Sequence, residues 1–186
     1  MAVASLLLAG LTVSLIYAMR CLSQFRAYHT VQQQSTLALL ALSDDLGVSN
    51  SAAMVLGTAD SCILPSPYRP RVQPDWKTFA YSSSSLAFRS WVCYYRTANG
   101  DLHRAETDMG GSYVVSAIPV ASRPVLGVFT GLVGLENRVV ARHLGEFKVD
   151  SSATAATVQL TVSVAVQVNS TRKTELKSVS LVRVRN

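Results

Sequence analysis

The three cysteines are the most reactive side chains in this 186-residue sequence, and their spacing does not form a metal or redox motif. Cys21, Cys62 and Cys93 are too far apart for the CxxC pairs of zinc sites or thiol oxidoreductases. A Cys62–Cys93 disulfide is compatible with a domain outside the cytoplasm, and two buried free thiols fit equally well. Cys21 would then be the unpaired cysteine.

The histidines and carboxylates also lack a catalytic arrangement. His29, His103 and His143 have no cysteine or carboxylate at ligand spacing, which favours solvated or helix-surface positions. Asp44 and Asp45 are adjacent near an expected helix end, and we interpret them as surface charge or as partners of arginines elsewhere in the fold. The sequence contains no nucleophile elbow, Walker loop or dinucleotide fingerprint. We therefore expect no enzymatic activity, no cofactor and no small-molecule substrate.

The first element is an apolar segment, Met1–Met19, that contains no charged residue. A helix of this length rises about 28 Å, close to the roughly 30 Å hydrocarbon core of a bilayer. The segment lacks the basic start of a signal peptide and is longer than its apolar region, so we predict a retained membrane helix. We expect the following residues to contact lipid or other helices: Leu6, Leu7, Leu8, Gly10, Leu11, Val13, Leu15 and Ile16.

A second helical pattern follows without interruption from Arg20 to Leu46. Its apolar residues recur mostly every three or four positions, which predicts one buried helix face. We expect one helix over residues 1–47, embedded in the membrane over about 1–19, with Gly47 as the residue that ends it. The side chains predicted to pack on the following domain are Phe25, Leu39, Leu42 and Leu46.

Residues 48–186 predict a single β-rich domain. Asn99-Gly100 lies between the strand-like segments Arg89–Thr97 and Leu102–Thr107, and this dipeptide is typical of a hairpin turn in which both residues have positive φ. Valine and leucine alternate with other residues over Thr157–Val168, which predicts a long strand with one buried face that pairs with Glu175–Arg185.

The other segments of this domain give weaker patterns. Four prolines predict a loop over Ser49–Asp75, Tyr113–Val120 is a candidate strand, and Leu135–Leu144 fits a short helix or a connection. The expected fold is therefore α+β, with a long helix, half transmembrane and half amphipathic, packed on a mainly antiparallel sheet.

The chain carries a net charge of +6, but its basic residues are scattered. We interpret this charge as a solvated basic surface. Nucleic-acid binding would need the C-terminal basic residues gathered on one exposed face. These are Arg172, Lys173, Lys177, Arg183 and Arg185. The triplet Asn169–Thr171 fits a glycosylation sequon, and we expect it to lie in a turn.

Several stretches, in this order, resemble the minor pseudopilins of the J class in type II secretion and the related minor pilins of the type IV pilin family. Met1–Gly10 is similar to the interior of a prepilin helix, and Leu42–Leu46 is similar to a Leu-x-x-Asp-Leu helix end. Trp91–Arg96 followed by Gly100–Glu106 resembles a hairpin in which an aromatic strand meets a Gly-x-Leu-x-Arg strand. The last segments that resemble the family are Val139–Phe147 and Val182–Asn186.

The resemblance implies a pilin-like subunit that assembles into or caps a pseudopilus or pilus. Its partners would be other pilin subunits, contacted through the N-terminal helix, and the bacterial inner membrane, with the head in the periplasm or outside the cell. The family's basic leader, cleavage-site glycine and early glutamate do not occur here. We expect them upstream of Met1; the alternative is a relative without a leader.

Arg20 and Arg26 follow the apolar segment, and the positive-inside rule alone would place them in the cytoplasm. A basic leader upstream would resolve this conflict. Two other functions stay open. One is a single-pass anchored binding or sensor domain, for which a flexible linker after the membrane helix would be expected. The other is a DNA-uptake minor pilin with a basic head.

Overall fold

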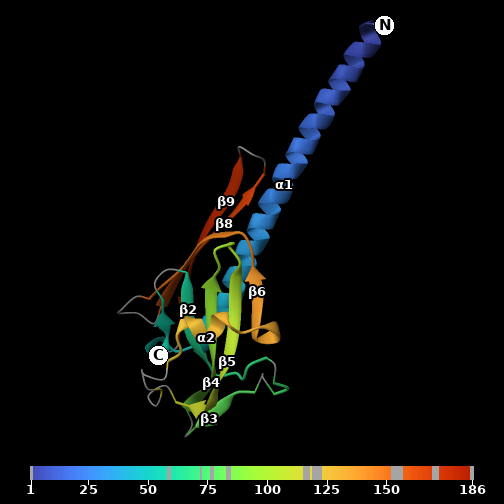
Figure 1. The fold of residues 1–186 in the computed structure, drawn as a ribbon. Helices are drawn as coiled ribbons and strands as arrows, with labels where there is room; N and C mark the ends of the chain where they lie inside the picture. The colour runs from blue at the N-terminus through green and yellow to red at the C-terminus, as the bar shows by residue number, and fades with distance from the viewer. Residues whose placement is uncertain are drawn as a thin grey trace.

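The fold consists of one long N-terminal helix, α1 (Ala2–Val48), and a β-rich head at its C-terminal end (Figure 1). The computed structural model describes residues 2–57, 60–71, 73–75, 78–82, 85–114, 118, 123–151, 157–168 and 172–184. The sequon Asn169–Thr171, Arg185 and much of the candidate strand Tyr113–Val120 lie outside these ranges. The predicted α+β class, a long helix on a mainly antiparallel sheet, is confirmed.

Helix α1 runs for 47 residues, so the apolar and amphipathic segments form one rod. The sequence between Gly10 and Gly47 contains neither proline nor glycine, the residues that most often kink or end helices. Gly47 was predicted to end the helix in a left-handed conformation, but it lies within α1 and its φ is not positive. A tighter turn ends the helix instead, in which the Ser49 amide donates to the Leu46 carbonyl at 3.1 Å.

The described strands form two antiparallel sheets, one of six strands and one of three. The larger sheet has the order β1-β2-β4-β5-β6, with β3 paired to β4. Its strands are β1 (Val55–Leu56), β2 (Ser61–Ser66), β3 (Ala80–Ser82), β4 (Ser85–Arg96), β5 (Leu102–Tyr113) and β6 (Asn137–Ala141). The smaller sheet has the order β7-β8-β9. Its strands are β7 (Leu144–Ser151), β8 (Thr157–Gln167) and β9 (Lys173–Arg183).

The β4–β5 hairpin lies where the sequence predicts it, but its turn differs from the prediction. The Gly100 amide donates to the Thr97 carbonyl at 2.9 Å, and Gly100 has a φ of +81°. Asn99 is not among the described residues with positive φ, so this is a three-residue loop that ends in a left-handed glycine. A Cβ at Gly100 would also lie 2.9 Å from the Leu144 carbonyl oxygen, so the turn packs directly on β7.

Other head segments depart from the predictions. The segment Ser49–Asp75 contains the buried strand β2. Pro65 fits there because, in the described part of the chain, no strand pairs with β2 on its other side at that position. The segment Leu135–Leu144 is mostly strand β6, preceded by a 3-10 turn at Gly134–Glu136. A short helix, α2 (Leu126–Thr130), was not predicted.

Two apolar cores hold the head together. The first lies between α1, one face of the large sheet and the inner face of the small sheet. It contains the alternating β8 residues Val158, Leu160, Val162 and Val164, as the sequence predicts. The second core lies on the opposite face of the large sheet, around Trp91, and includes Phe129 of α2. Helix α1 therefore forms part of the main core of the head.

Candidate functional site: the stem helix and its anchor

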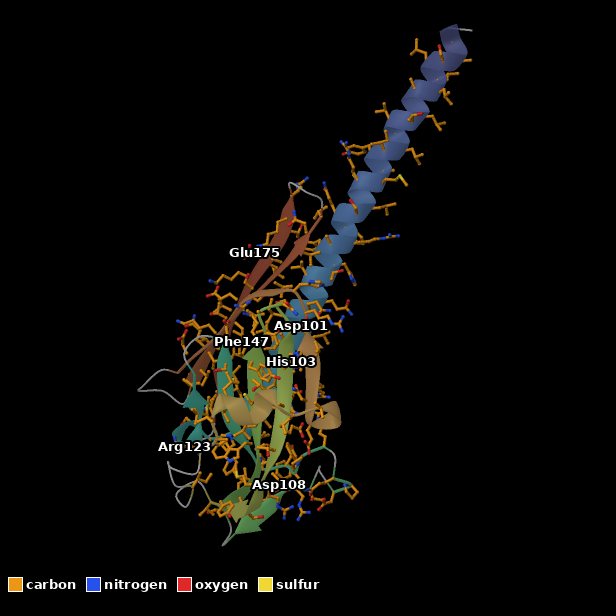
Figure 2. The ribbon with its side chains drawn as sticks, viewed as in Figure 1. Asp101, His103, Asp108, Arg123, Phe147 and Glu175 are labelled. Atoms are coloured by element: carbon orange, nitrogen blue, oxygen red, sulfur yellow. The ribbon has the colours of Figure 1, made fainter. Side chains whose placement is uncertain are left out.

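The N-terminal half of α1 is exposed on all sides. Residues 3–23, which we call the stem, are exposed at every position. In Figure 2 the stem projects beyond the β8–β9 hairpin, which is marked by Glu175, with its side chains pointing away from the rest of the molecule. Leu6, Leu7, Leu8, Leu11, Val13, Leu15 and Ile16 are 47–76% exposed, and Gly10 is also exposed. So many exposed apolar residues require lipid or another protein surface.

The stem meets the length and composition needed to cross a membrane. Helix α1 contains an apolar window with a mean hydropathy of 1.7, and none of that window is buried in the molecule. A core helix of a soluble domain would be covered by the rest of the fold. The stem is therefore compatible with a transmembrane helix.

The C-terminal half of α1 is anchored in the head by apolar packing. Leu42 and Leu46 are fully buried in the first core, and Leu39 is half-buried against it, as predicted. Phe25 was also predicted to pack on the head, and this is wrong because its side chain is 68% exposed. The first buried position of α1 is Ala27, so Phe25 precedes the region that the head covers.

A buried ion cluster ties the end of α1 to the large sheet. Asp45, in the last turn of α1, accepts hydrogen bonds from Arg104 Nε at 2.6 Å and from Arg104 Nη2 at 3.1 Å. The Tyr94 hydroxyl lies 2.6 Å from the same carboxylate and 2.8 Å from the Ala41 carbonyl. Asp44, the adjacent acid, is exposed. The interpretation of Asp45 as a partner for an arginine is thus confirmed, and Asp44 is the surface charge.

The cluster continues beyond Arg104 into the head. Arg104 Nη1 contacts Glu106 Oε1, and Glu106 Oε2 accepts a hydrogen bond from the Arg71 amide at 2.6 Å. Arg104 and Glu106 are 5% and 3% exposed. The two carboxylates of Asp45 and Glu106 therefore surround the buried guanidinium, which offsets much of its desolvation cost.

The charges in the ion cluster shift the pKa values of its members. Burial by itself disfavours the charged form of Arg104, but the hydrogen bonds that Arg104 donates to Asp45 raise the pKa of Arg104 above its ordinary value. Burial, and then the negative charge of Asp45, raises the pKa of Tyr94. Burial and the Arg104 charge lower the pKa of Arg71. At neutral pH Arg104 is charged and Tyr94 is protonated, the states that this arrangement requires.

A pocket of about 480 Å³ adjoins the ion cluster. Its lining combines Asp44 and Val48 of α1 with Arg69, Ser90 and Glu106 of the head. Acidic and basic groups are both present, so the lining does not select one sign of charge. The pocket was not predicted, because its residues come from α1 and from distant segments of the head.

Polar contacts earlier in α1 hold the helix against β9 and against the connection between β6 and β7. The Ser35 hydroxyl lies 2.8 Å from that of Ser178 on β9, and Gln34 Oε1 accepts a hydrogen bond from the Arg142 amide at 2.7 Å. These contacts and the ion cluster are spread over three turns of the helix. A helix held at separate points along its length cannot pivot freely on the head.

Of the two alternatives for Cys62 and Cys93, the structure has the free thiols and not the disulfide. Both thiols are free and buried. In the β2–β4 pairing Cys62 is opposite Tyr94 and Ile63 is opposite Cys93, so the two cysteines are offset by one residue. A one-residue offset directs side chains to opposite faces of a sheet, and Cys62 and Cys93 accordingly lie in different cores. Cys21 is exposed on the stem.

The histidines and acids do not converge on a metal site. Among the described residues, no three His, Cys, Asp or Glu side chains are grouped closely enough to hold an ion. His103 stacks on Tyr95 with ring centroids 5.1 Å apart, and its Nδ1 lies 2.9 Å from Asn137 Oδ1. Figure 2 shows His103 near the start of β5, well away from Asp108 farther along that strand.

The C-terminal basic residues do not form one free basic face. Lys173 pairs with Glu175 at 3.5 Å, and Lys177 pairs with Glu146 at 2.8 Å. The Val168 amide donates a hydrogen bond to the Arg172 carbonyl, so these two residues lie opposite each other. Arg172 also lines a pocket next to α1. The described part of this basic set is therefore split between two sides of the hairpin and is partly neutralised.

Comparisons with known proteins identify no relative of this chain. No family model, no curated protein and no solved structure matches it significantly.

Proposed function

We propose that this chain is a membrane-anchored subunit of the minor pilin or pseudopilin type, which assembles into or caps a short filament through its stem. One observation carries the proposal: a single helix is bare and apolar over residues 3–23 and rigidly anchored in a β-rich head over its C-terminal half. The bacterial inner membrane would hold the stem before assembly, with the head in the periplasm or outside the cell.

The stem has the surface that helix–helix assembly in a membrane needs. Leucine and valine pack equally well against lipid chains and against other helices, so stems can exchange one environment for the other. Ala4, Ala9 and Gly10 allow close approach of a neighbouring backbone. The role proposed is mechanical, with no covalent catalysis.

The anchor supports this proposal more than it supports a tethered domain. Asp45 of the Leu42–Leu46 stretch contacts Arg104 of the Gly100–Glu106 stretch, so two of the segments that resemble pilins meet at one buried contact. A rigid joint between stem and head is what a filament subunit needs, because forces on the stem must reach the head. A tethered receptor has no such need.

The second candidate is a single-pass anchored binding domain. The pocket of about 480 Å³ beside the ion cluster favours it, because this volume lies within the range of small-molecule sites. The DNA-uptake alternative gains no support from the partly neutralised basic residues of β9.

Cross-linking between stems tests the proposal against the second candidate. The full chain with Cys21→Ser carries one new cysteine at Leu8 in the stem or, as a control, at Val133 in the head, which is 81% exposed. Oxidation in the producing cell's membranes should link position 8 to a protein that itself has a long apolar N-terminal helix, identified by mass spectrometry. Monomers at position 8, with or without links at position 133, would contradict stem-mediated assembly.

A further inference from the structure

Strands β8 and β9 run beside α1 (Figure 1). A groove lies between α1 and the neighbouring ends of these two strands, around Val168 and Arg172. One part, of about 500 Å³, is lined by Leu22, Arg26 and Val166, among others. The adjoining part, of about 410 Å³, is lined by Tyr17, Arg20 and Arg172 among others. Ser23 and Val168 line both parts, so we treat them as one hairpin groove.

The charged groups in the hairpin groove are all positive. Arg20, Arg26 and Arg172 line it, and none of the described lining residues is a carboxylate. Among the described residues none of the three forms an ion pair. Glu175, the nearest acid on β9, accepts a hydrogen bond from Ser163 and pairs with Lys173 on the outward face of the hairpin. Three unpaired guanidinium groups beside apolar side chains are complementary to an amphipathic anion.

The depth of the groove matches the headgroup layer of a bilayer. The polar layer adds roughly 5–8 Å beyond the hydrocarbon core on each side, or about three to five helical residues. With Met1–Met19 in the core, Arg20 lies in this layer, and Arg26, six residues later, lies about 9 Å farther from the core at the outer edge of the layer. Tyrosine is enriched at this boundary, and Tyr17 lies at the corresponding end of the groove.

We propose that the hairpin groove binds an anionic phospholipid, with Arg20, Arg26 and Arg172 around its phosphate and Leu22, Val166 and Val168 against its glycerol and upper acyl chain. This inference rests on the membrane-anchored function proposed above. It gives the arginines that follow the apolar segment a role on the side of the membrane where the head lies. The bound lipid also fixes how deep the stem is inserted and how the hairpin meets the membrane.

Native mass spectrometry of the full chain in mild detergent tests the proposal with dioleoyl phosphatidylglycerol and, for comparison, dioleoyl phosphatidylcholine. The wild type should retain one phosphatidylglycerol in preference to phosphatidylcholine, and millimolar inorganic phosphate should not displace it. The triple variant Arg20→Gln, Arg26→Gln, Arg172→Gln should lose this preference. Each arginine should contribute a factor on the order of fivefold to the ratio of bound phosphatidylglycerol to bound phosphatidylcholine. Equal retention of both lipids, or displacement by inorganic phosphate, would overturn the lipid site.

A matched variant removes the same charge from the other side of the hairpin. The triple variant Lys173→Gln, Lys177→Gln, Arg183→Gln should keep the wild-type preference for phosphatidylglycerol. An equal loss of that preference in this variant would show that net charge alone causes it, and would overturn the site. Flotation of the full chain with pure phosphatidylcholine vesicles separates this inference from the proposed anchoring. Flotation without a phosphatidylglycerol preference rejects only the lipid site, and failure to float rejects both.

Discussion

Asp45 is the residue on which the joint between helix and head most depends. A carboxylate in the last turn of a helix opposes the helix dipole, so Asp45 is unfavourable for the isolated helix. The buried guanidinium of Arg104 reverses this, with two hydrogen bonds of 2.6 and 3.1 Å to the carboxylate. Asp44 stands one position earlier, is exposed and forms no ion pair among the described residues. The two aspartates therefore make a matched pair.

Asp45→Ala should destabilise the full chain by about 3–5 kcal/mol, because it leaves a buried arginine without one of its partners. Asp44→Ala should change the free energy of unfolding by no more than about 0.5 kcal/mol, or raise it slightly, because it removes an exposed charge from a helix C-terminus. Urea unfolding in mild detergent, followed by tryptophan fluorescence, measures both. Equal effects of the two substitutions would mean that the ion cluster does not hold the helix end.

The three thiols should differ sharply in reactivity. Burial raises the pKa of Cys93 to about 12, and burial together with neighbouring Cys93 raises the pKa of Cys62 further. Raised pKa values keep both thiols protonated even above the ordinary thiol pKa, and only the thiolate reacts. At pH 8 in detergent, maleimide should modify Cys21 alone. Denaturation without a reductant should expose two more thiols; a single reactive thiol there would reveal the disulfide that the strand register excludes.

At the scale of elements, hydrophobic periodicity predicted the structure correctly where the conformation of an element depends mainly on its own sequence. The uninterrupted helix and the β8 alternation are local properties of their segments, and both predictions hold. Strand β2 was missed because Pro65 suggests a loop, although an unpaired strand edge accommodates a proline. Phe25 was predicted to pack on the head because the apolar periodicity of the helix extends to the N-terminal side of Ala27. The head buries α1 only from Ala27 onward, so Phe25 is exposed.

Contacts between elements could not be derived from the sequence in the same way. Asp45 was expected to be either surface charge or an arginine partner, and only the packing of α1 on β5 selects Arg104. The choice between a Cys62–Cys93 disulfide and two free thiols stayed open because it depends on the strand register, which decides the sheet face of each residue. The hairpin groove was not expected, since it joins segments more than 130 positions apart.

The anchor half of α1 should show the contrast between buried and exposed leucines. Leu42 is fully buried and Leu40 is 58% exposed, although they are two positions apart on one helix. Leu42→Ala should lower the free energy of unfolding by about 2–5 kcal/mol, and Leu40→Ala should change it by less than about 0.5 kcal/mol. Urea unfolding measures both variants. A large loss at Leu40 would indicate that another surface covers the outer side of α1.

At the scale of the whole molecule, the fixed angle between stem and head is the property that matters. The apolar core, the Ser35 contact with β9 and the ion cluster hold α1 at separate points over its C-terminal half. The stem continues from this anchor with no helix-breaking residue before Gly10. A force on the stem, or a shift of the stem, is therefore transmitted directly to the head.

A distance measurement between stem and head tests this rigidity most directly. Cys21 is exposed and takes one nitroxide label, while a second goes on Leu181→Cys, at a 71% exposed position of β9. Because Arg172 lines the groove beside Cys21 and β9 rises about 3.3 Å per residue, the two sites should be roughly 30 Å apart. Double electron–electron resonance on the full chain in lipid nanodiscs should give one narrow distance distribution near that value. A broad or multimodal distribution would show a flexible joint and contradict the single rigid rod.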